Sequence, residues 1–409
     1  MKKFKKFLLD IKEAHCLLKT PADYPMSFHD SIQHVSQQDW TTVQSESNNI
    51  FLSYNYLKAV EESQSQYAFR YLVFYRNHMP VAIAYVQVLQ IKLAESLNFS
   101  DCQHFSAGKE LLFGDKASKV LICGNVFSSG ENGFAHSNTI GKEEAYNALM
   151  NALCRLRRNE NALGDVSSVV IKEFWEKNYD GLAMLNKNAY RGFEVEPNLV
   201  LRIESSWHKM QDYLGDITKK YRKRYRDVMK KSEGLLVREF SAEEIADHSP
   251  RIKELFDAVH EKADFKFGHF NAAGFYDLKR NLHDQFIFKA YYLDAQLVAF
   301  AALFVNGEAL DANYIGLDYD VNKTHCLYHR MLFDFVDVAI DQHCNELFYG
   351  RTASEIKSSI GAVPVNMKLY LRHRNTLGNQ LLKPLLKFVQ PTAFEVRNPF
   401  KTEEVLPTA

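Results

Sequence analysis

The feature that most constrains the fold is an order of elements that occurs twice in the 409 residues. Each half contains a β-rich hairpin, a strand ending in glycine, a long helix, a short strand, and a Gly-to-Pro segment that leads to a closing strand. These elements lie at 67–93, 119–125, 142–158, 167–174 and 192–204 in the first half, and at 286–305, 308–316, 325–342, 346–350 and 361–373 in the second. Residue identity between the halves is low, so the order alone predicts an internal duplication with its boundary near Glu204–Trp207.

Turn and helix signals support this order. The pairs Asn77-His78 and Asn306-Gly307 lie between β-rich runs, which predicts hairpins. The helix predicted from His325 to Gln342 has one apolar stripe at helical spacing, formed by Leu327, Met331, Leu332, Phe335, Val338 and Ala339. Hairpins followed by strand–helix–strand segments predict an α/β (α+β) fold with mixed β-sheets flanked by helices.

Composition sets the class of protein. Hydrophobic residues make up 46% of the chain and charged residues 24%, which is ordinary globular composition and excludes extended disorder. The formal net charge is zero, so binding of a polyanion needs a local basic patch. We predict a basic N-terminal helix with a connector, two similar domains and a polar tail, at 1–49, 50–204, 205–400 and 401–409.

The cysteines and the N-terminus bear on location. Six scattered cysteines without a CxxC pair are typical of a reduced protein, and we expect a cytoplasmic one. The start, residues 1–18, is basic, but Asp10, Lys12 and Glu13 interrupt its apolar run, so it does not fit a signal peptide or a membrane span. It predicts a short amphipathic helix that can make peripheral membrane contact.

The segment Gly350–Lys357 begins at the end of a strand and enters a helix. A helix N-terminus leaves backbone N–H groups free, and these suit an anion such as a pyrophosphate. Arg351 stands where a guanidinium can bind a carboxylate or phosphate through two parallel hydrogen bonds. We expect Arg351 and Lys357 to contact a bound ligand. The alternative is that Arg351 pairs with an internal carboxylate, while Thr352 and Ser354 cap the helix.

Residues 218–231, TKKYRKRYRDVMKK, concentrate positive charge on a predicted helix. Arg222, Arg226 and Lys230 share one face, and an aromatic stripe that begins at Tyr221 lies on another. We expect Arg222 and Arg226 to bind substrate, whether tRNA, coenzyme phosphates or an anionic lipid surface. The alternative is a solvated helix whose aromatic stripe packs on the core.

Two further segments contain candidate binding residues. The loop 123–134 has three glycines but no G-K-[ST] ending, so it is not a P-loop; it is either a long turn or a cover over substrate, with Asn125 as a candidate contact. Residues 260–278 place five aromatic rings among polar residues, which suits core packing or the wall of an acyl-chain pocket that includes Phe267.

A metal site is not expected. The segment around His325 and Cys326 also contains His329, and His343-Cys344 follows farther along the chain. The helix predicted between His325 and His343 separates them by roughly 27 Å at 1.5 Å per residue. The remaining pair, His325 and His329, lacks a third ligand for zinc.

These segments resemble the Fem-type (FemABX-like) N-acyltransferases, a branch of the GNAT acyltransferase superfamily. The residues that carry the resemblance are YIGLDYDVNKTHCLYHRML (314–332), LFYGRTASEIKSSIGAVP (347–364), CGNVFSSGENGF (123–134) and KKYRKRYRDVMKK (219–231). The resemblance extends over about residues 50–400. It implies tandem duplicated GNAT-like domains, of which the second binds the donor.

The resemblance makes residues 317–324 the counterpart of the pyrophosphate-binding loop of GNATs. In most GNATs that loop has the pattern Arg/Gln-x-x-Gly-x-Gly/Ala, whereas here no glycine follows Gly316. A glycine-free loop brings its backbone less close to a phosphate. We still expect Gly316, Lys323 and Thr324 to contribute to the binding of the donor.

The resemblance implies transfer of an acyl group from acyl-CoA, as co-substrate, to an amine acceptor without a metal. Some Fem-type enzymes use aminoacyl-tRNA on peptidoglycan-type precursors instead, and a catalytically inactive binding protein is a further alternative. Direct transfer needs a base for the amine and a proton donor for the leaving group. Asp318 and Tyr319 stand nearest the donor loop, and Tyr328 lies where GNATs often have a proton-donating tyrosine.

Overall fold

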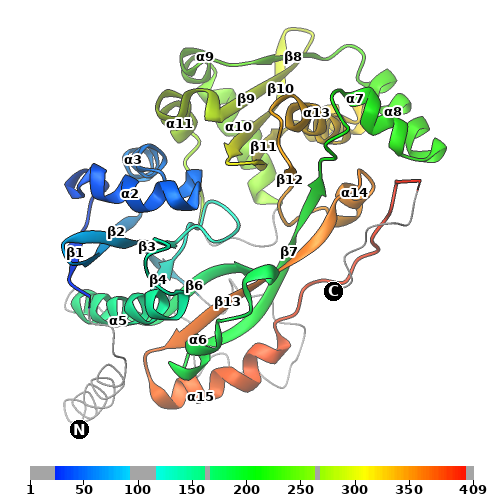
Figure 1. The fold of residues 1–409 in the computed structure, drawn as a ribbon. Coiled ribbons are helices and arrows are strands. Elements are labelled where there is room, and N and C mark those ends of the chain that lie inside the picture. The colour runs from blue at the N-terminus through cyan, green and yellow to red at the C-terminus, as the bar shows by residue number, and fades with distance from the viewer. Residues whose placement is uncertain (1–23, 93–116, 162–165, 263–267, 402–409) are drawn as a thin grey trace. The chain divides into compact units, whose positions relative to one another are not determined.

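The computed structural model describes residues 24–92, 117–161, 166–262 and 268–401, and its contacts divide the chain into two compact units (Figure 1). Of the described residues, the first unit holds 24–196, 268–269 and 366–391, and the second holds 197–262, 270–365 and 392–401. The chain passes between the units inside two strands, β7 (Arg191–Arg202) and β13 (Val363–His373). Residues 366–391 therefore belong to the first unit, whereas the sequence analysis placed them in the second domain.

The first unit consists of strands covered by helices on both faces. Its strands are β1 (Met26–His29), β2 (Ala68–Arg76), β3 (Met79–Ile91), β4 (Ser118–Cys123), β5 (Phe134–His136), β6 (Val166–Trp175) and most of β13. They hydrogen-bond in the order β1-β2-β3-β4-β6-β13, with β5 beside β3, and β4 and β6 are parallel. Its helices are α2 (Gln37–Ser47), α3 (Tyr54–Ser63), α5 (Lys142–Asn161), α6 (Ala183–Lys187) and α15 (Thr376–Leu385).

The core of the first unit follows from the alternation of its strands. Leu72 and Phe74 of β2 lie in one apolar cluster with Leu149 and Leu153 of α5. On the opposite face Tyr71 meets Trp40 of α2 edge to face, with ring centroids 5.8 Å apart. Alternate residues of a strand point to opposite faces, so β2 contributes to both layers.

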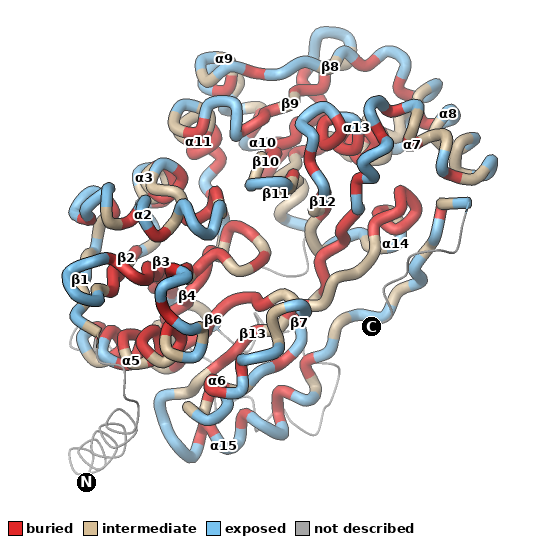
Figure 2. Tube along the Cα trace, viewed as in Figure 1, coloured by how far each residue is buried: buried red, intermediate tan, exposed pale blue. Residues whose placement is uncertain are grey.

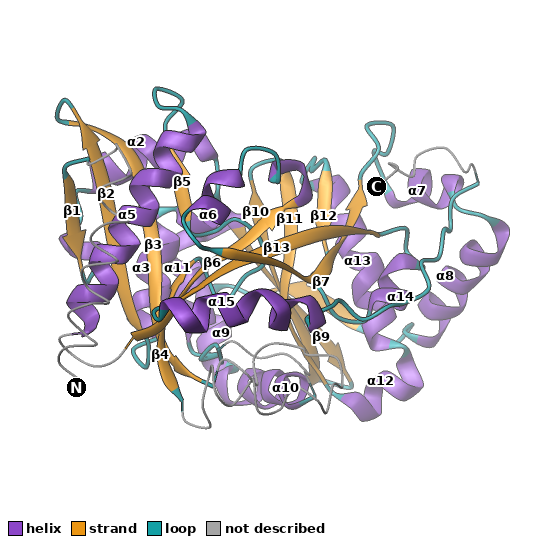
Figure 3. Ribbon diagram, turned by 90° about the horizontal axis from the view of Figure 1, so that it is seen from below, coloured by secondary structure: helices purple, strands orange, loops and turns teal. Residues whose placement is uncertain are grey.

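The second unit repeats this plan. Its strands are the end of β7, β8 (Leu236–Glu239), β9 (Phe286–Leu293), β10 (Gln296–Asn306), β11 (Ala309–Leu317) and β12 (Glu346–Phe348). They hydrogen-bond in the order β7-β12-β11-β10-β9-β8, and β11 and β12 are parallel. Figure 3 shows β10, β11 and β12 next to one another. Its helices are α7 (Met210–Asp216), α8 (Lys219–Lys231), α9 (Ala242–Asp247), α10 (Ser249–Glu261), α11 (Gly274–Leu282), α12 (Tyr319–His325), α13 (Leu327–Asp341) and α14 (Ser354–Ser358).

Strand β10 separates the two layers of this unit. Phe300 packs against Phe256 of α10 and Phe275 of α11, with ring centroids 6.4 Å and 5.3 Å apart. The neighbouring Ala299 and Ala301 belong instead to the apolar cluster that contains the buried residues of α13. Small residues on one face and large rings on the other let two helical layers pack on one strand.

The strand orders confirm the predicted α/β fold with a tandem repeat. Reading each unit from its outer edge gives β1-β2-β3-β4-β6 and β8-β9-β10-β11-β12, each ending in a parallel pair. The closing strands are exchanged, however. Residues 200–202 of β7 pair with β12 of the second unit, and residues 367–373 of β13 pair with β6 of the first. Sequence order alone had assigned each closing strand to the half that it follows.

Several local predictions are confirmed. The Asn77-His78 turn joins β2 to β3, and both residues have positive φ (49° and 63°), as a tight two-residue hairpin turn requires. The Asn306-Gly307 turn joins β10 to β11, with Gly307 at φ 61°. Helix α5 begins at the predicted Lys142, and the basic segment forms α8 as predicted.

Two predictions of irregular structure are wrong. Residues 319–324, predicted as part of a loop, lie in helix α12, because Asp318 caps this helix by accepting bonds from Asp320 N and Val321 N. The helix predicted to start at His325 starts at Leu327 instead, after Cys326 takes a left-handed conformation (φ 50°). Residues 24–49, predicted as a connector, contain β1 and α2, whose Trp40 and Val43 are buried.

Candidate functional site

The two parallel strands of the second unit, β11 and β12, separate from each other along their length. Strands β11 and β12 pair from Ala309 opposite Glu346 to Asp311 opposite Phe348. Beyond that point, and among the described residues, β11 pairs only with β10 as far as Leu317. The chain after β12 stays with β7 instead, because Leu199 exchanges backbone hydrogen bonds with Tyr349 and Gly350. The two strands therefore stop pairing with each other after Asp311, and β11 continues to Leu317 beside β10.

A bulge in β11 coincides with this separation. Ala302 of β10 pairs with Tyr314 and Leu303 pairs with Ala312, so Asn313 is the extra residue on β11. A bulge bends its strand and re-aims the side chains and backbone groups next to it. The bend occurs two residues after Asp311, the last residue that pairs with β12.

The segment that follows β12 turns sharply into α14. Gly350 has φ 78°, and its N–H donates to the buried Asn198 Oδ1 at 2.9 Å. Ala353, just before α14, also has a positive φ (55°), which is unfavourable for a residue with a Cβ. Strained backbone of this kind persists where the surrounding structure fixes it, and such positions often belong to functional sites.

Lys357 is the unusual residue of this segment. Its side chain is only 3% exposed, and among the described residues no group pairs with its ammonium. Burial lowers the pKa of Lys357 to about 7. A Cβ placed on Gly350 would lie 3.9 Å from Lys357 Nζ, so the amine lies beside the backbone at the end of β12. The chain is buried from Lys357 through Ala362, and Figure 2 shows a buried stretch at α14.

Arg351 lies in the same segment and is half-buried. Burial lowers the pKa of its guanidinium to about 10. The Lys357 amine thus lies beside Gly350 at the end of β12, and Arg351 follows Gly350 directly in the chain. Contact of these residues with a donor stays a prediction. Two desolvated cations near a strand end are chemically suited to an anionic group.

Asp318 is occupied by structural bonds. Its Oδ1 accepts from Asp320 N and Val321 N at 3.0 and 3.3 Å, and its Oδ2 accepts from Arg251 Nη2 at 3.0 Å. Burial raises the pKa of Asp318, but these backbone bonds and the Arg251 guanidinium outweigh burial and hold the pKa below its usual value. The carboxylate is thus a helix cap and ion-pair partner.

The expected phosphate contacts of the predicted loop also have other partners. Lys323 is 73% exposed and pairs with Asp320 at 2.9 Å, within one turn of α12. The Thr324 hydroxyl donates to the Val321 carbonyl at 3.1 Å. Gly316 is a packing residue, since a Cβ there would lie 2.1 Å from Phe300 Cε1.

The two tyrosines lie in different surroundings. Lys262 Nζ stands 3.2 Å from the ring centroid of Tyr319, a cation–π contact. Tyr328 is in the first turn of α13, where it packs on the apolar cluster of this unit. Burial raises the pKa of both phenols, so both keep their protons at neutral pH.

Helix α8 presents its charges to solvent. It has eight Lys or Arg among thirteen residues, and among the described residues no carboxylate pairs with any of them. Tyr221, Tyr225 and Val228 pack on the core, as the aromatic stripe predicts. Arg226 is exposed and Arg222 half-buried.

Comparisons with known proteins identify the fold. No protein-family model and no curated protein sequence matches the chain. Among solved structures, FemX matches with a TM-score of 0.53 and 12% identity, over 84% of this chain and 96% of FemX. A tandem GNAT protein from the clavulanic acid biosynthesis pathway matches with a TM-score of 0.49 and 8% identity, over 86% of this chain and 99% of that one. The chain has a fold similar to that of FemX.

In this Fem-like fold the parallel pair of the first unit ends differently from that of the second. Beyond Cys123 opposite Ile171, the buried Lys172 Nζ donates to Asn125 O at 2.6 Å and Ser128 O at 2.9 Å. It also forms an ion pair with Glu173 at 3.3 Å, and Glu173 has φ 61° and is fully buried. The loop that follows β4 thus occupies the end of the β4–β6 pair.

Asn125, a predicted substrate contact, belongs to this internal network. It is fully buried, its Nδ2 donates to Tyr56 Oη at 2.7 Å, and its Oδ1 accepts from Phe127 N at 2.9 Å. The loop 123–134 is therefore a packed turn in the first unit. Phe267, the predicted pocket residue, lies outside the described residues.

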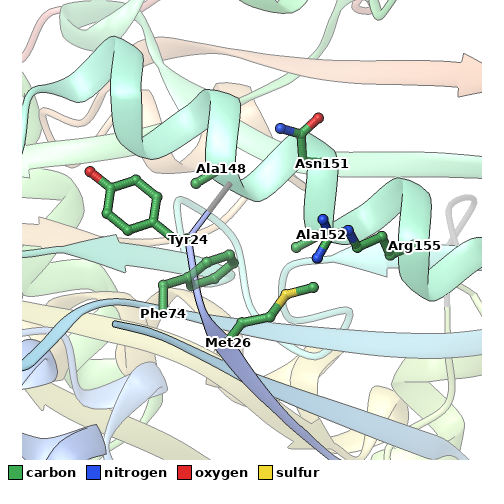
Figure 4. Close-up of a pocket in the computed structure, with 7 residues that line it drawn as sticks. All are labelled: Tyr24, Met26, Phe74, Ala148, Asn151, Ala152 and Arg155. Atoms are coloured by element: carbon green, nitrogen blue, oxygen red, sulfur yellow. The ribbon is translucent and has the colours of Figure 1, made fainter. Parts of the chain in front are cut away.

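Other features of the described residues do not suggest a second site. A hollow lined by residues of α5 and by Tyr24, Met26 and Phe74 has a volume of about 10 Å³, room for about one water molecule (Figure 4). No group of three or more His, Cys, Asp or Glu in the described part of the chain could hold a metal ion. None of the described helices is long and apolar enough to cross a membrane.

Two polar residues near the site were not predicted from the sequence. Asn198 accepts a hydrogen bond from Gly350 N, and Asp311 is the last residue of β11 that pairs with β12. Burial raises the pKa of Asp311 to about 7. Each is a polar residue inside an apolar run, NLVL and EALDANYIG, and that interruption is the signal that could have identified them.

Proposed function

We propose that the chain is an N-acyltransferase that moves an acyl group from acyl-CoA to an amine acceptor. The observation that carries the proposal is Lys357, a buried amine without a partner among the described residues, at the end of a parallel pair that separates. Leaving a buried cation unpaired is costly for a folded chain. Such groups cluster at functional sites, where a ligand supplies the missing charge.

In the proposed reaction the amine nitrogen attacks the thioester carbonyl carbon. A C–N bond forms and the C–S bond breaks. The nitrogen releases one proton to solvent, and the sulfur leaves as a thiol after taking one proton. We assign Lys357 and Arg351 to the anionic part of the donor. We assign the proton that the sulfur takes to Tyr328, because its phenol stays protonated at neutral pH. A backbone N–H of β11 beyond Asp311, where β12 no longer pairs with that strand, is suited to the developing oxyanion.

Two alternatives have an observation in their favour. The uncompensated charge of α8 suits a tRNA, which favours an aminoacyl-tRNA donor and a peptidoglycan-type acceptor. Helix α12 and the internal pairing of Lys323 favour a binding protein without catalysis, because they replace the usual phosphate loop. We also propose a cytoplasmic location, supported by the four described cysteines, all of which are free.

A thermal-shift titration with coenzyme A, acetyl-CoA and a long-chain acyl-CoA tests the proposal. Ligand at about 100 times its dissociation constant should stabilise the fold by about 2.7 kcal/mol. The stabilisation should be larger for the acylated forms and absent in Lys357→Met. No shift with any of the three, together with a shift on adding aminoacyl-tRNA, would favour the tRNA donor. A shift without turnover across a panel of amines would favour the binding protein.

A further inference from the structure

A C-terminal segment of the second unit, residues 392–401, runs in extended form beside α14 and α7. We name it the strap. Arg397 Nη2 donates to Glu355 Oε2 of α14 at 2.9 Å, and Arg397 N donates to Ser358 Oγ of the same helix at 3.1 Å. The strap is therefore attached to α14 at two points, which flank Lys357 in the sequence.

The far end of the strap is anchored in an aromatic cluster. The Phe400 ring stacks on Trp207 at 5.9 Å and meets Tyr213 edge to face at 6.3 Å. Thr218 N donates to Pro399 O at 2.8 Å, and Lys401 N donates to Asp216 O at 3.1 Å. Rings packed this way, together with backbone bonds, fix the end of an otherwise extended segment.

The turn after α14 is shaped to receive this anchor. A Cβ on Gly361 would lie 2.5 Å from Phe400 Cε2, and Gly361 has φ 106°, a conformation that suits glycine. The hydroxyl of Tyr213, from the same aromatic cluster, donates to Ile360 O at 2.9 Å. Both ends of the short helix are thus held from one side by the strap and its anchor.

The geometry of α14 places Lys357 on the other side. Glu355 and Ser358 are three residues apart and share one helical face, whereas Lys357 projects away from that face. We infer that the strap is a positioning element that presses α14 onto the unit and keeps the Lys357 amine beside Gly350, with Arg397 as the positioning residue. The role of the amine in donor binding rests on the proposed function; its positioning by the strap does not.

The test measures the amine directly. The full chain is labelled with acetic anhydride at a series of pH values without any donor, and acetylation of Lys357 is measured by mass spectrometry. Arg397→Ala should raise the labelling rate about threefold to fivefold, because loss of an exposed ion pair makes local opening of α14 more frequent. Arg397→Lys should restore most of the protection, and Arg202→Ala, which removes an exposed ion pair with Glu204, should have no effect.

The pH at half-maximal labelling separates positioning from general stability. In Arg397→Ala it should move up toward that of an ordinary lysine, while the melting temperature stays near that of the wild type. Unchanged labelling and midpoint in both Arg397→Ala and Phe400→Ala would overturn the inference. If Phe400→Ala does not fold, the two Arg397 variants decide the matter alone. Absence of donor binding in the wild type would reject the proposed function and leave this result intact.

Discussion

Each unit contains an equivalent pair of parallel strands, β4 and β6 in the first unit and β11 and β12 in the second. A buried lysine lies at the end of each pair, and the two lysines differ in whether other groups of the protein pair with them. In the first unit Lys172 is buried with two carbonyl acceptors and the Glu173 carboxylate. In the second unit Lys357 is equally buried and has no partner among the described residues. The two lysines come from different elements, β6 and α14, so the difference reflects what surrounds each strand end.

The comparison shows how a duplicated fold can divide its roles. A satisfied polar network rigidifies the unit that contains it, while an unsatisfied cation reduces stability until a ligand binds. By this criterion the first pair is structural and the second is the candidate site. Variants of the two lysines test this assignment, because their effects on stability should have opposite signs.

The largest expected effect is on Lys172. Lys172→Met leaves the fully buried Glu173 carboxylate without its ion pair and two backbone carbonyls without their donor. Unfolding free energy, measured by urea titration, should fall by about 3–5 kcal/mol. Lys58→Met, which removes an exposed pair with Glu62, should change it by less than about 0.5 kcal/mol. A small loss in Lys172→Met would mean that the network is not structural.

The opposite sign is expected for Lys357→Met. The folded pKa of about 7 lies below the ordinary value of 10.5, so the unfolded chain binds this proton more tightly. The cost of Lys357 is therefore full below pH 7 and disappears as pH rises toward 10.5. At pH 7 the variant should gain about 1–4 kcal/mol in unfolding free energy and lose donor binding. A stability gain that does not shrink between pH 7 and pH 10 would contradict this explanation.

A third test concerns the last paired residues of the two strands, Cys123 in β4 and Asp311 in β11. Burial, which the Asn306 bond only partly offsets, raises the pKa of Asp311 to about 7 from 3.8. The folded state then binds the proton more tightly, so stability falls as pH rises from 3.8 to 7 and stays low above it. Asp311→Asn should stabilise the protein by about 1–3 kcal/mol at pH 8 and have little effect at pH 4, in urea titrations at both values. An equal effect at both pH values would show that the charge of Asp311 is not responsible.

The smallest effect on stability is expected for α8, where Arg226 is exposed and Lys230 is also on the surface. Changing both to Glu should alter unfolding free energy by less than about 0.5 kcal/mol. If acyl-CoA is the donor, its dissociation constant should also remain unchanged in calorimetry. Salt-dependent binding of tRNA to the wild type that weakens in this variant would favour the tRNA donor instead.

The sequence was informative where structure is local. The Asn77-His78 turn, the stripe of α13 and the aromatic stripe of α8 depend on neighbouring residues and were predicted correctly. The exchange of β7 and β13 was not, because pairing between distant strands depends on the whole fold. Asp318 is the N-cap of α12, so residues predicted as a loop form a helix. The N-cap is a local signal, but the analogy with the GNAT phosphate loop led to the prediction of a loop.

The candidate site was predictable only in part. The segment Gly350–Lys357 was identified from its position after a strand. Neither the unpaired state of Lys357 nor the strap could be inferred, since both depend on residues far away in the sequence. Arg397 and Glu355, for example, meet across 42 positions.

The measurement that tests the central claim most directly is the stoichiometry of acetyl-CoA binding, by isothermal titration calorimetry on the full chain. We predict one molecule per chain for the wild type, no binding for Lys357→Met, and wild-type binding for Lys58→Met. Two molecules per chain, or binding that is unchanged in Lys357→Met, would contradict the assignment of the donor site to the second unit alone.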